Sequence, residues 1–265
     1  MPQALVDYHV ANHIATITMN DPKTLNAFST PLKVAIMDAL NNADQNTDVR
    51  VIILQGSGHN FSSGGHIGEM LENGMESAAL VAKLDFMLRE VAEVSLKLRN
   101  IHKPIIAKLE GAVAGAGMNL ALTCDFRIAA DNAKFVQAFI NIGLIPDAGG
   151  IYLLNQLIGA AKTTELVMLG NKLTSEDVAR LDLVNKVVSP NELDAEVTAL
   201  ATRLSQLPGK ALASMKHMIN VHAFSGLNEA LDMEVEQQNM MAETADFKEG
   251  ITAFMEKRKP VYQGK

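Results

Sequence analysis

Two glycine turns and one acid give this chain its candidate chemistry. The first turn reads GAVAGAG over residues 111–117, between the apolar runs 104–109 and 118–124. This order predicts a strand, a turn and a short helix, whose first N–H groups would meet negative charge unblocked by side chains. A similar turn, Ser63-Gly64-Gly65, follows the preceding apolar run. Two such turns on neighbouring strands could aim one N–H each at one point, as an oxyanion hole does; the alternative is two tight strand-to-helix turns.

The acid is Asp147, which stands in the sequence GLIPDAGG over residues 143–150. Apolar sequence flanks this Pro/Gly turn, so we expect the carboxyl group to be partly desolvated. Desolvation raises the pKa of a carboxyl group and makes it a candidate base. The alternative is an ordinary turn or N-cap residue in front of a helical segment at 150–157.

Alternating strand and helix patterns predict a layered α/β protein around these residues. Strands are predicted over residues 5–10, 14–19, 51–54, 104–109 and 126–130, the first two as a hairpin and the run 51–54 covered on both faces. Helices are predicted from an N-cap at Thr30 to about residue 40, over 75–98, 118–124 and 246–259, with a mostly helical pattern from residue 160 onward. The last helix has an apolar face that needs a partner surface, for which a second subunit is a candidate.

Composition excludes several classes of function. The 265 residues are 48% hydrophobic and 20% charged, which is typical of a globular protein. A net charge of -7 without clustered cations argues against nucleic-acid binding. The single cysteine, Cys124, excludes an internal disulfide, and the scattered histidines have no metal-ligand spacing. The N-terminus lacks a signal pattern and no apolar run reaches membrane length, so we expect a cytoplasmic protein without membrane contact.

Six motifs resemble, in order and spacing, the crotonase (enoyl-CoA hydratase/isomerase) superfamily. They are Asp21-Pro22-Lys23-x-Leu25-Asn26-Ala27, Phe61-Ser62-Ser63-Gly64-Gly65-x-Ile67, Ile105-Ile106-Ala107-x-x-x-Gly111, Cys124-Asp125-x-x-Ile128-Ala129, Gly143-x-x-Pro146-x-Ala148-Gly149-Gly150 and Phe254-x-x-Lys257-Arg258. The resemblance runs the whole length. It implies an α/β fold with a crotonase-like ββα spiral core over residues 1–200 and a C-terminal helical trimerisation region over 201–265. It also implies a homotrimer or a dimer of trimers, and an acyl-CoA thioester substrate, with coenzyme A part of the substrate and no separate cofactor.

The resemblance also implies roles for individual residues. The two N–H groups that hold the thioester oxygen in this family match Gly65 and Ala116. Hydratases of the family carry two glutamates at positions that hold Asn119 and Phe139 here, so the resemblance stops short of hydratase chemistry. Asp147 occupies a turn where several members that shift double bonds carry their catalytic carboxylate. The residues expected at the substrate are Lys23, Leu25, Ser63, His66, Ile67, Asn119, Phe139, Phe254 and Lys257. The last two are expected to reach the CoA from a neighbouring subunit.

His66 stands where the family usually has an aspartate, and the alternative to substrate contact is a supporting or surface role. The run 138–147 and the C-terminal residues 257–265 look most like ring-1,2-epoxyphenylacetyl-CoA isomerases, which are also enoyl-CoA isomerases. The implied mechanism moves a proton from the α- to the γ-carbon of a 3-enoyl-CoA through Asp147. Three alternatives stay open: a hydratase that uses Asp147 or Asn119, an aspartate nucleophile as in aryl-CoA dehalogenases, and a non-catalytic acyl-CoA- or RNA-binding protein of this fold.

Overall fold

The main sheet has six strands in the order β1-β2-β3-β4-β6-β9. The computed structural model describes residues 4–72, 74 and 77–265. The strands are β1 (Val6–Ala11), β2 (Ile14–Met19), β3 (Val51–Gly56), β4 (Ile105–Leu109), β6 (Phe126–Ala130) and β9 (Lys186–Val188). β1 and β2 pair antiparallel as the predicted hairpin, and the other neighbours pair parallel. All five predicted strands are therefore confirmed.

A second sheet of three strands has the order β5-β7-β8, with β5 (Ala112–Ala114), β7 (Lys134–Val136) and β8 (Lys172–Thr174). The sequence predicts an uninterrupted glycine turn where β5 lies, and that prediction is wrong. The backbone of this stretch is extended because Ala112 and Ala114 exchange hydrogen bonds with Ser62 while the strand pairs with β7. The second sheet thus connects the two glycine turns immediately before the next helix begins.

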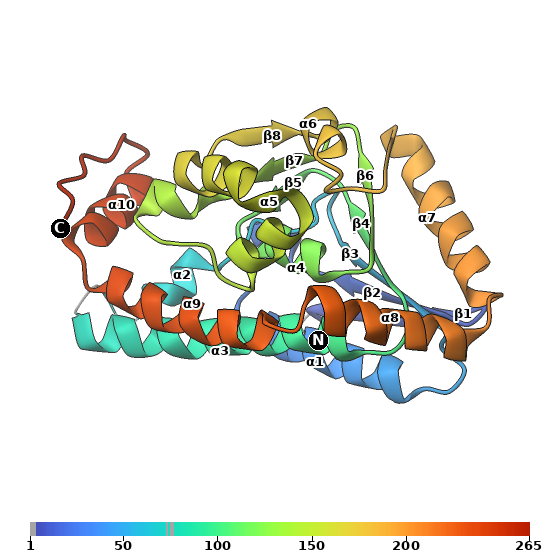
Figure 1. Cartoon of the computed structure of the whole chain (residues 1–265). Coiled ribbons are helices and arrows are strands. Elements are labelled where there is room, and N and C mark those ends of the chain that lie inside the picture. The colour runs from blue at the N-terminus through green and yellow to red at the C-terminus, as the bar shows by residue number, and fades with distance from the viewer. Residues whose placement is uncertain (1–3, 73, 75–76) are drawn as a thin grey trace.

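Ten α-helices are described along these residues, and helices cover both faces of the main sheet (Figure 1). They are α1 (Thr30–Gln45), α2 (Ile67–Met70), α3 (Ser77–Asn100), α4 (Ala116–Thr123), α5 (Gly150–Leu169), α6 (Ser175–Arg180), α7 (Pro190–Ser205), α8 (Gly209–Ala223), α9 (Leu227–Ala242) and α10 (Ala245–Met255), with short 3₁₀ turns at Pro22–Thr24 and Ala138–Ile142. Along β3, Ile52 and Leu54 join the core under α1 and α3, whereas Val51 and Ile53 pack against α7. The expected two-sided burial of this strand is confirmed.

Three helix ends differ from the sequence prediction. Ser29, not Thr30, is the N-cap of α1, and its Oγ accepts from the Leu32 amide. Thr30 is the first helical residue instead, because its amide and hydroxyl donate to Glu69 and Glu90. α4 begins two residues early, at Ala116, and α1 continues to Gln45.

At the C-terminus, α10 ends at Met255, so the basic residues 257–259 lie beyond the helix that was predicted to include them. The cause is a left-handed backbone at Lys257, whose φ is 55°. α3 confirms the predicted helix over its described residues, whereas residues 75–76 of that prediction lie outside them. The division at residue 200 stays a prediction. No helix in the described part of the chain is long and apolar enough to cross a membrane.

Candidate active site

Three residues singled out in the sequence line one small cavity. It measures about 30 Å³, and Gly65, Ala116 and Asp147 all contribute to its wall. The other lining residues come from the loop before α1 and from α1, α2 and α3: Phe28, Lys33, Met70, Leu84, Met87, Leu88 and Val91. Most of this wall is apolar, and Lys33 and Asp147 are its charged members. Residues 82 positions apart in the sequence thus meet at one point.

The two glycine turns meet backbone to backbone at this cavity. A Cβ placed on Gly64, whose φ is +94°, would lie 2.8 Å from the Ala114 carbonyl oxygen and 3.4 Å from the Ala116 nitrogen. Only glycine permits both this φ and this approach. A Cβ on Gly65 would meet no atom within 4 Å, so its backbone borders open space.

The N–H of Gly65 and the N–H of Ala116 have no hydrogen-bond partner among the described residues. Ala116 is the first residue of α4, where the helix itself supplies no acceptor. Ser62 holds the Ser63-Gly64-Gly65 turn in place, since its Oγ donates to the Asn26 carbonyl and accepts from the Gly64 amide. The arrangement offers two adjacent amide donors to an anionic oxygen.

Hydrogen bonds on both sides hold the turn that carries Asp147. The Asp147 carbonyl accepts from Asn119 Nδ2 at 2.8 Å and from the Gly150 amide at 2.9 Å. Ser95 Oγ donates to the Ala148 carbonyl at 3.1 Å. Ala148 and Gly149 have φ values of 54° and 86°, a left-handed pair that turns the chain sharply into α5. These bonds go to the main chain of the turn and leave the carboxyl oxygen Oδ1 without a partner among the described residues.

The carboxyl group of Asp147 has the properties of a buried base. The residue is partly buried, and its Oδ1 is out of contact with solvent and accepts no hydrogen bond from the described residues. Burial raises the pKa of Asp147 to about 7, and the positive charge of Lys33 opposes this rise. An acid with a pKa near neutral can both take and return a proton at physiological pH.

Lys33 is a member of the site that the sequence reading missed. Its side chain is 3% exposed, and its Nζ donates to the Met87 carbonyl at 2.9 Å and pairs with Glu90 at 2.8 Å. Burial lowers the pKa of Lys33, while Glu90 acts against that effect. A signal was present in the sequence: Lys33 and Leu32 share the face of α1 that buries Ile36 and Leu40, so a charge interrupts an apolar stripe.

The two residues at the hydratase glutamate positions lie beside the cavity without lining it. Asn119 is fully buried, and both its polar atoms are in use: Nδ2 donates to the Asp147 carbonyl and Oδ1 accepts from Gln137 Nε2 at 2.7 Å. Phe139 packs in the apolar cluster that includes Met70 and Leu84. Asn119 thus supports the Asp147 turn, and substrate contact by either residue stays a prediction.

Comparisons with known proteins show the family of this chain. A family model described as enoyl-CoA hydratase/isomerase matches residues 9–265. The chain belongs to that family. The predicted crotonase superfamily and its fold are thereby confirmed, and a solved enoyl-CoA hydratase from Bacillus halodurans superimposes with a TM-score of 0.88 at 27% identity, covering 94% of this chain and 99% of the other.

Relatives within the family carry different activities in their names. The chain is 37% identical to trans-2-decenoyl-[acyl-carrier-protein] isomerase of Streptococcus mutans, over 97% of each chain. It is 34% identical to a probable enoyl-CoA hydratase of Rhodobacter capsulatus, over 98% of each chain, and 33% identical to 1,2-epoxyphenylacetyl-CoA isomerase of Escherichia coli, over 97% of each chain. Membership in the enoyl-CoA hydratase/isomerase family therefore leaves two reaction types to be decided.

The residues expected around the CoA divide into two groups. Ser63 joins the 3₁₀ turn that carries Lys23, because its Oγ donates to the Thr24 carbonyl and its amide to the Leu25 carbonyl. Lys23 and Leu25 are exposed on this turn, next to the Gly65 loop. Phe254 and Lys257 are also exposed but do not line the cavity of their own chain. Their predicted contact from a neighbouring subunit stays a prediction.

His66 and Ile67 begin helix α2 directly after Gly65. His66 is the N-cap, and its Nδ1 accepts from the Glu69 amide at 2.9 Å. The ring thus supports the short helix that contributes Met70 to the cavity. Ile67 packs against the apolar cluster behind it. The capping bond gives His66 a structural role, and contact with a substrate remains a prediction.

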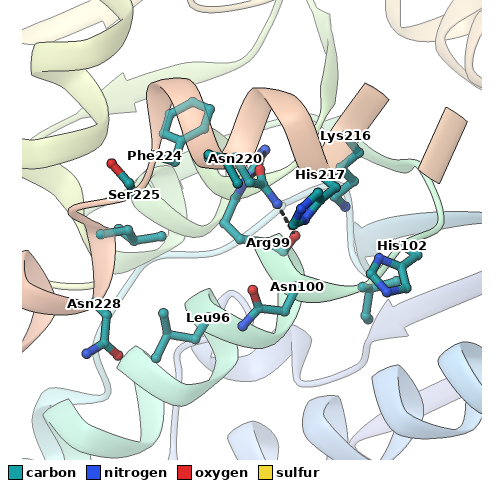
Figure 2. A pocket seen from close by; sticks show the side chains of 13 residues that line it. Leu96, Arg99, Asn100, His102, Lys216, His217, Asn220, Phe224, Ser225 and Asn228 are labelled. Carbon is teal, nitrogen blue, oxygen red and sulfur yellow. Dashed lines mark hydrogen bonds between the residues drawn. The ribbon is translucent and has the colours of Figure 1, made fainter. Parts of the chain in front are cut away.

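A larger cavity elsewhere, about 380 Å³, lies between the end of α3 and α8 (Figure 2). Its buried cations are already engaged: Lys216 donates to Asp125 and to the carbonyls of Leu98 and Lys103. Arg99 donates to Asn220 Oδ1, and Asn220 Nδ2 donates to the Arg99 carbonyl; Figure 2 marks a hydrogen bond between these two residues. These groups are turned into the protein, so this cavity offers a ligand little charge. No group of three or more His, Cys, Asp or Glu in the described ranges is placed to hold a metal ion.

Proposed function

We propose that this protein is an acyl-thioester isomerase that shifts a double bond from the 3-position to the 2-position of an enoyl thioester. One observation carries the proposal: Asp147 is the sole carboxyl group among the described residues that line the cavity at the two free amides of Gly65 and Ala116. One base facing one oxyanion hole suits a proton transfer within a single substrate molecule. We propose ring-epoxides of aryl-acetyl thioesters as a second substrate class. Their isomerisation to an oxepin uses the same enolate chemistry.

The reaction begins with the thioester oxygen between the Gly65 and Ala116 amides. The Asp147 carboxylate takes a proton from C2, the electron pair of that C–H bond forms the C1–C2 double bond of a dienolate, and negative charge gathers on the thioester oxygen. Each amide donor aimed at that charge contributes roughly 3 kcal/mol of transition-state stabilisation. The dienolate then takes the proton back from Asp147 at C4, which places the double bond between C2 and C3. Atoms and charge balance without a co-reactant.

Three features support isomerisation over hydration. Hydration needs a group that orients a water molecule and one that moves its proton. Asn119 has both polar atoms engaged in the protein, and Phe139 offers no proton. Most of the cavity wall is built of Met70, Leu84 and other apolar side chains, which excludes bulk water from the dienolate.

The carrier of the acyl group is either coenzyme A or an acyl carrier protein, since both present a thioester. The family resemblance favours CoA, and the 37% identical relative from Streptococcus mutans is named for an acyl-carrier-protein substrate. Matched 3-enoyl substrates on the two carriers decide the matter. A preference for one carrier in kcat/KM, at equal acyl group, identifies it.

The deciding experiment follows ultraviolet absorbance of a 3-enoyl thioester as its double bond becomes conjugated. We expect conjugation by the wild type and its loss in Asp147→Asn. Hydration of a 2-enoyl thioester without conjugation of the 3-enoyl isomer would overturn the proposal in favour of a hydratase. Binding of both thioesters with no turnover of either would leave an acyl-thioester-binding protein.

We also propose a homotrimer or a dimer of trimers. Support comes from α8, on which four apolar side chains are more than half exposed in the single chain: Met215, Met218, Ile219 and Val221. Such a row on one helix is unusual on a monomer and needs a partner surface. Sedimentation equilibrium distinguishes one, three and six copies.

A further inference from the structure

Helix α9 lies directly behind the turn that carries Asp147. It runs beside α3 in Figure 1 and buries one face, formed by Leu227, Leu231, Glu234, Val235, Gln238 and Ala242. Two members of this face are polar, and they stand one helical turn apart. Both are almost wholly buried: Glu234 is 7% exposed and Gln238 is 0% exposed. Polar side chains at such positions are retained only where they bond to something specific.

Their partners lie on either side of Asp147. Gln238 accepts from the Ile145 amide at 2.9 Å and donates to the Ile145 carbonyl at 2.8 Å, two residues before Asp147. Glu234 Oε2 accepts from the Gly149 amide at 2.7 Å, two residues after Asp147. One helix therefore holds both ends of the segment from Ile145 to Gly149.

Glu234 reaches the turn from outside the catalytic cavity. It lines a separate groove of about 410 Å³, formed by residues of α5 and α9 such as Tyr152 and Met233, and it is not part of the Asp147 cavity wall. Its second oxygen, Oε1, is buried without a partner among the described residues. Burial raises the pKa of Glu234 to about 8, and the negative charge of Asp147 acts in the same direction. The side chain thus presents a protonated carboxyl group to the turn at neutral pH.

We propose that Glu234 is a positioning residue for the reaction: its bond to the Gly149 amide sets the turn that aims the Asp147 carboxyl group into the cavity. This inference rests on the proposed role of Asp147 as the base. The left-handed pair Ala148-Gly149 is where the chain would relax if the bond were lost, because Gly149 has no side chain to restrict it. A displacement of about 1 Å in a catalytic group costs up to about 100-fold in rate.

Two substitutions separate this role from a merely structural one. Glu234→Ala removes the acceptor, and we expect kcat to fall about tenfold to 100-fold with KM changed less than about twofold, since the substrate does not touch Glu234. Glu234→Gln keeps the shape of the protonated carboxyl group and an acceptor for the Gly149 amide, so kcat should stay within about threefold of wild type. The exposed neighbour Glu236 supplies the matched control, Glu236→Ala, with wild-type kinetics.

A second readout is independent of turnover. Hydrogen–deuterium exchange of the segment 145–151 should become at least about tenfold faster in Glu234→Ala and stay near the wild-type rate in Glu234→Gln and Glu236→Ala. If the wild type proves to be a hydratase or inactive, the proposed function fails while this exchange pattern still reports whether Glu234 fixes the turn. Unchanged exchange in Glu234→Ala, or a Gln variant as slow in turnover as the Ala variant, overturns the inference.

Discussion

Two buried groups of charged side chains in this protein each combine a lysine with an aspartate, and they differ in whether the aspartate is paired. Beside α8, the Lys216 Nζ lies 2.8 Å from Asp125 Oδ2 and the Arg99 Nη1 lies 3.4 Å from Asp125 Oδ1. At the catalytic cavity, Lys33 pairs with Glu90 at 2.8 Å and shares the cavity wall with Asp147. Burial lowers the pKa of both lysines. In the first group the acid is paired; in the second, one acid is left over.

Hydrogen bonding explains the difference. Asp125 Oδ2 accepts from the Ile105 amide and from Lys216, so the carboxylate is held between a strand and a helix. The Arg99 guanidinium also lies 4.5 Å from the centre of the Phe224 ring. Asp147 Oδ1, in contrast, has no partner in the described structure. A buried charge with hydrogen-bond partners links the elements that supply them. A buried carboxyl group without such partners has a raised pKa and is a candidate for proton transfer.

The largest effect expected from this contrast is on turnover by Asp147→Asn. The variant keeps the shape of the side chain and loses the base, so kcat should fall about 10² to 10⁴-fold. KM should change little, and the protein should unfold at the same or a higher temperature, because an unpaired buried acid is replaced by a neutral group. Steady-state kinetics on the 3-enoyl thioester and thermal unfolding test both parts. A variant that turns over normally would show that the leftover acid is not the base.

Lys216→Met is the corresponding change in the paired group. It leaves Asp125 buried beside Arg99 with one cation fewer, and we expect a loss of about 3 kcal/mol in unfolding free energy. Turnover per folded molecule should stay within about twofold of wild type, because none of these residues lines the catalytic cavity. Urea unfolding measures the loss, with Lys210→Met, an exposed position on the same helix, as control. A marginal change in stability would contradict the structural role assigned to this cluster.

Lys33→Met tests whether Lys33, unlike Lys216, affects catalysis through the pKa of a nearby aspartate. Removing the positive charge takes away the influence that holds the pKa of Asp147 down, so more of the base is protonated at neutral pH. At pH 6.5 we expect kcat/KM to fall about tenfold, with recovery as the pH is raised. Because the change also removes the cationic partner of Glu90, Lys33→Met combined with Glu90→Gln is the matched control. Equal losses at every pH would mean that Lys33 acts on the fold alone.

The wild-type pH profile follows from the same group. Asp147 must be ionised to act as the base, and burial raises its pKa to about 7. We therefore expect kcat/KM to rise with pH up to about 7 and then to level, with a slope near tenfold per pH unit on the acid side. A plateau already reached at pH 5 would indicate an exposed carboxylate instead.

The sequence could predict the parts of this site that depend on local patterns. Apolar runs located five of the six strands of the main sheet, and the glycine pattern located the two turns, because positive φ values and close backbone contacts demand glycine there. The family resemblance then singled out Gly65 and Ala116 within these turns. Asp147 was recognisable as the acid of a Pro/Gly turn. These features require no knowledge of which distant segments meet.

Contacts between distant segments were beyond that reasoning. Lys33 reaches the cavity from α1, and Glu234 approaches the Asp147 turn from a helix more than eighty residues later. Their sequence signal was only a polar residue within an otherwise buried helix face, which does not name a partner. The capping role of His66 was likewise hidden, since a histidine N-cap is not among the residues usually preferred there.

The smallest predicted effect is on how the free energy of unfolding depends on pH, where Asp147 and Asp125 should behave differently. The folded pKa of Asp147, about 7, lies above the ordinary aspartate value of about 3.9. Its contribution to stability is therefore complete below about pH 4 and is lost as the pH rises through 7. The full difference between these two pKa values corresponds to about 4 kcal/mol. Because Asp147 is only partly buried, solvent screens part of this, and we expect Asp147→Asn to gain about 1 to 2 kcal/mol over wild type between pH 4 and pH 8.

Asp125→Asn supplies the opposite sign within the same experiment, because it leaves Lys216 and Arg99 without their buried acid and should lower stability at neutral pH. Urea unfolding at pH 4, 6 and 8 compares the two variants with wild type. If Asp147→Asn gained nothing between pH 4 and pH 8, its carboxyl group would titrate alike in the folded and unfolded chain. Asp147 and Asp125 would then not differ in how burial affects the free energy of unfolding, and water would reach Oδ1 of Asp147.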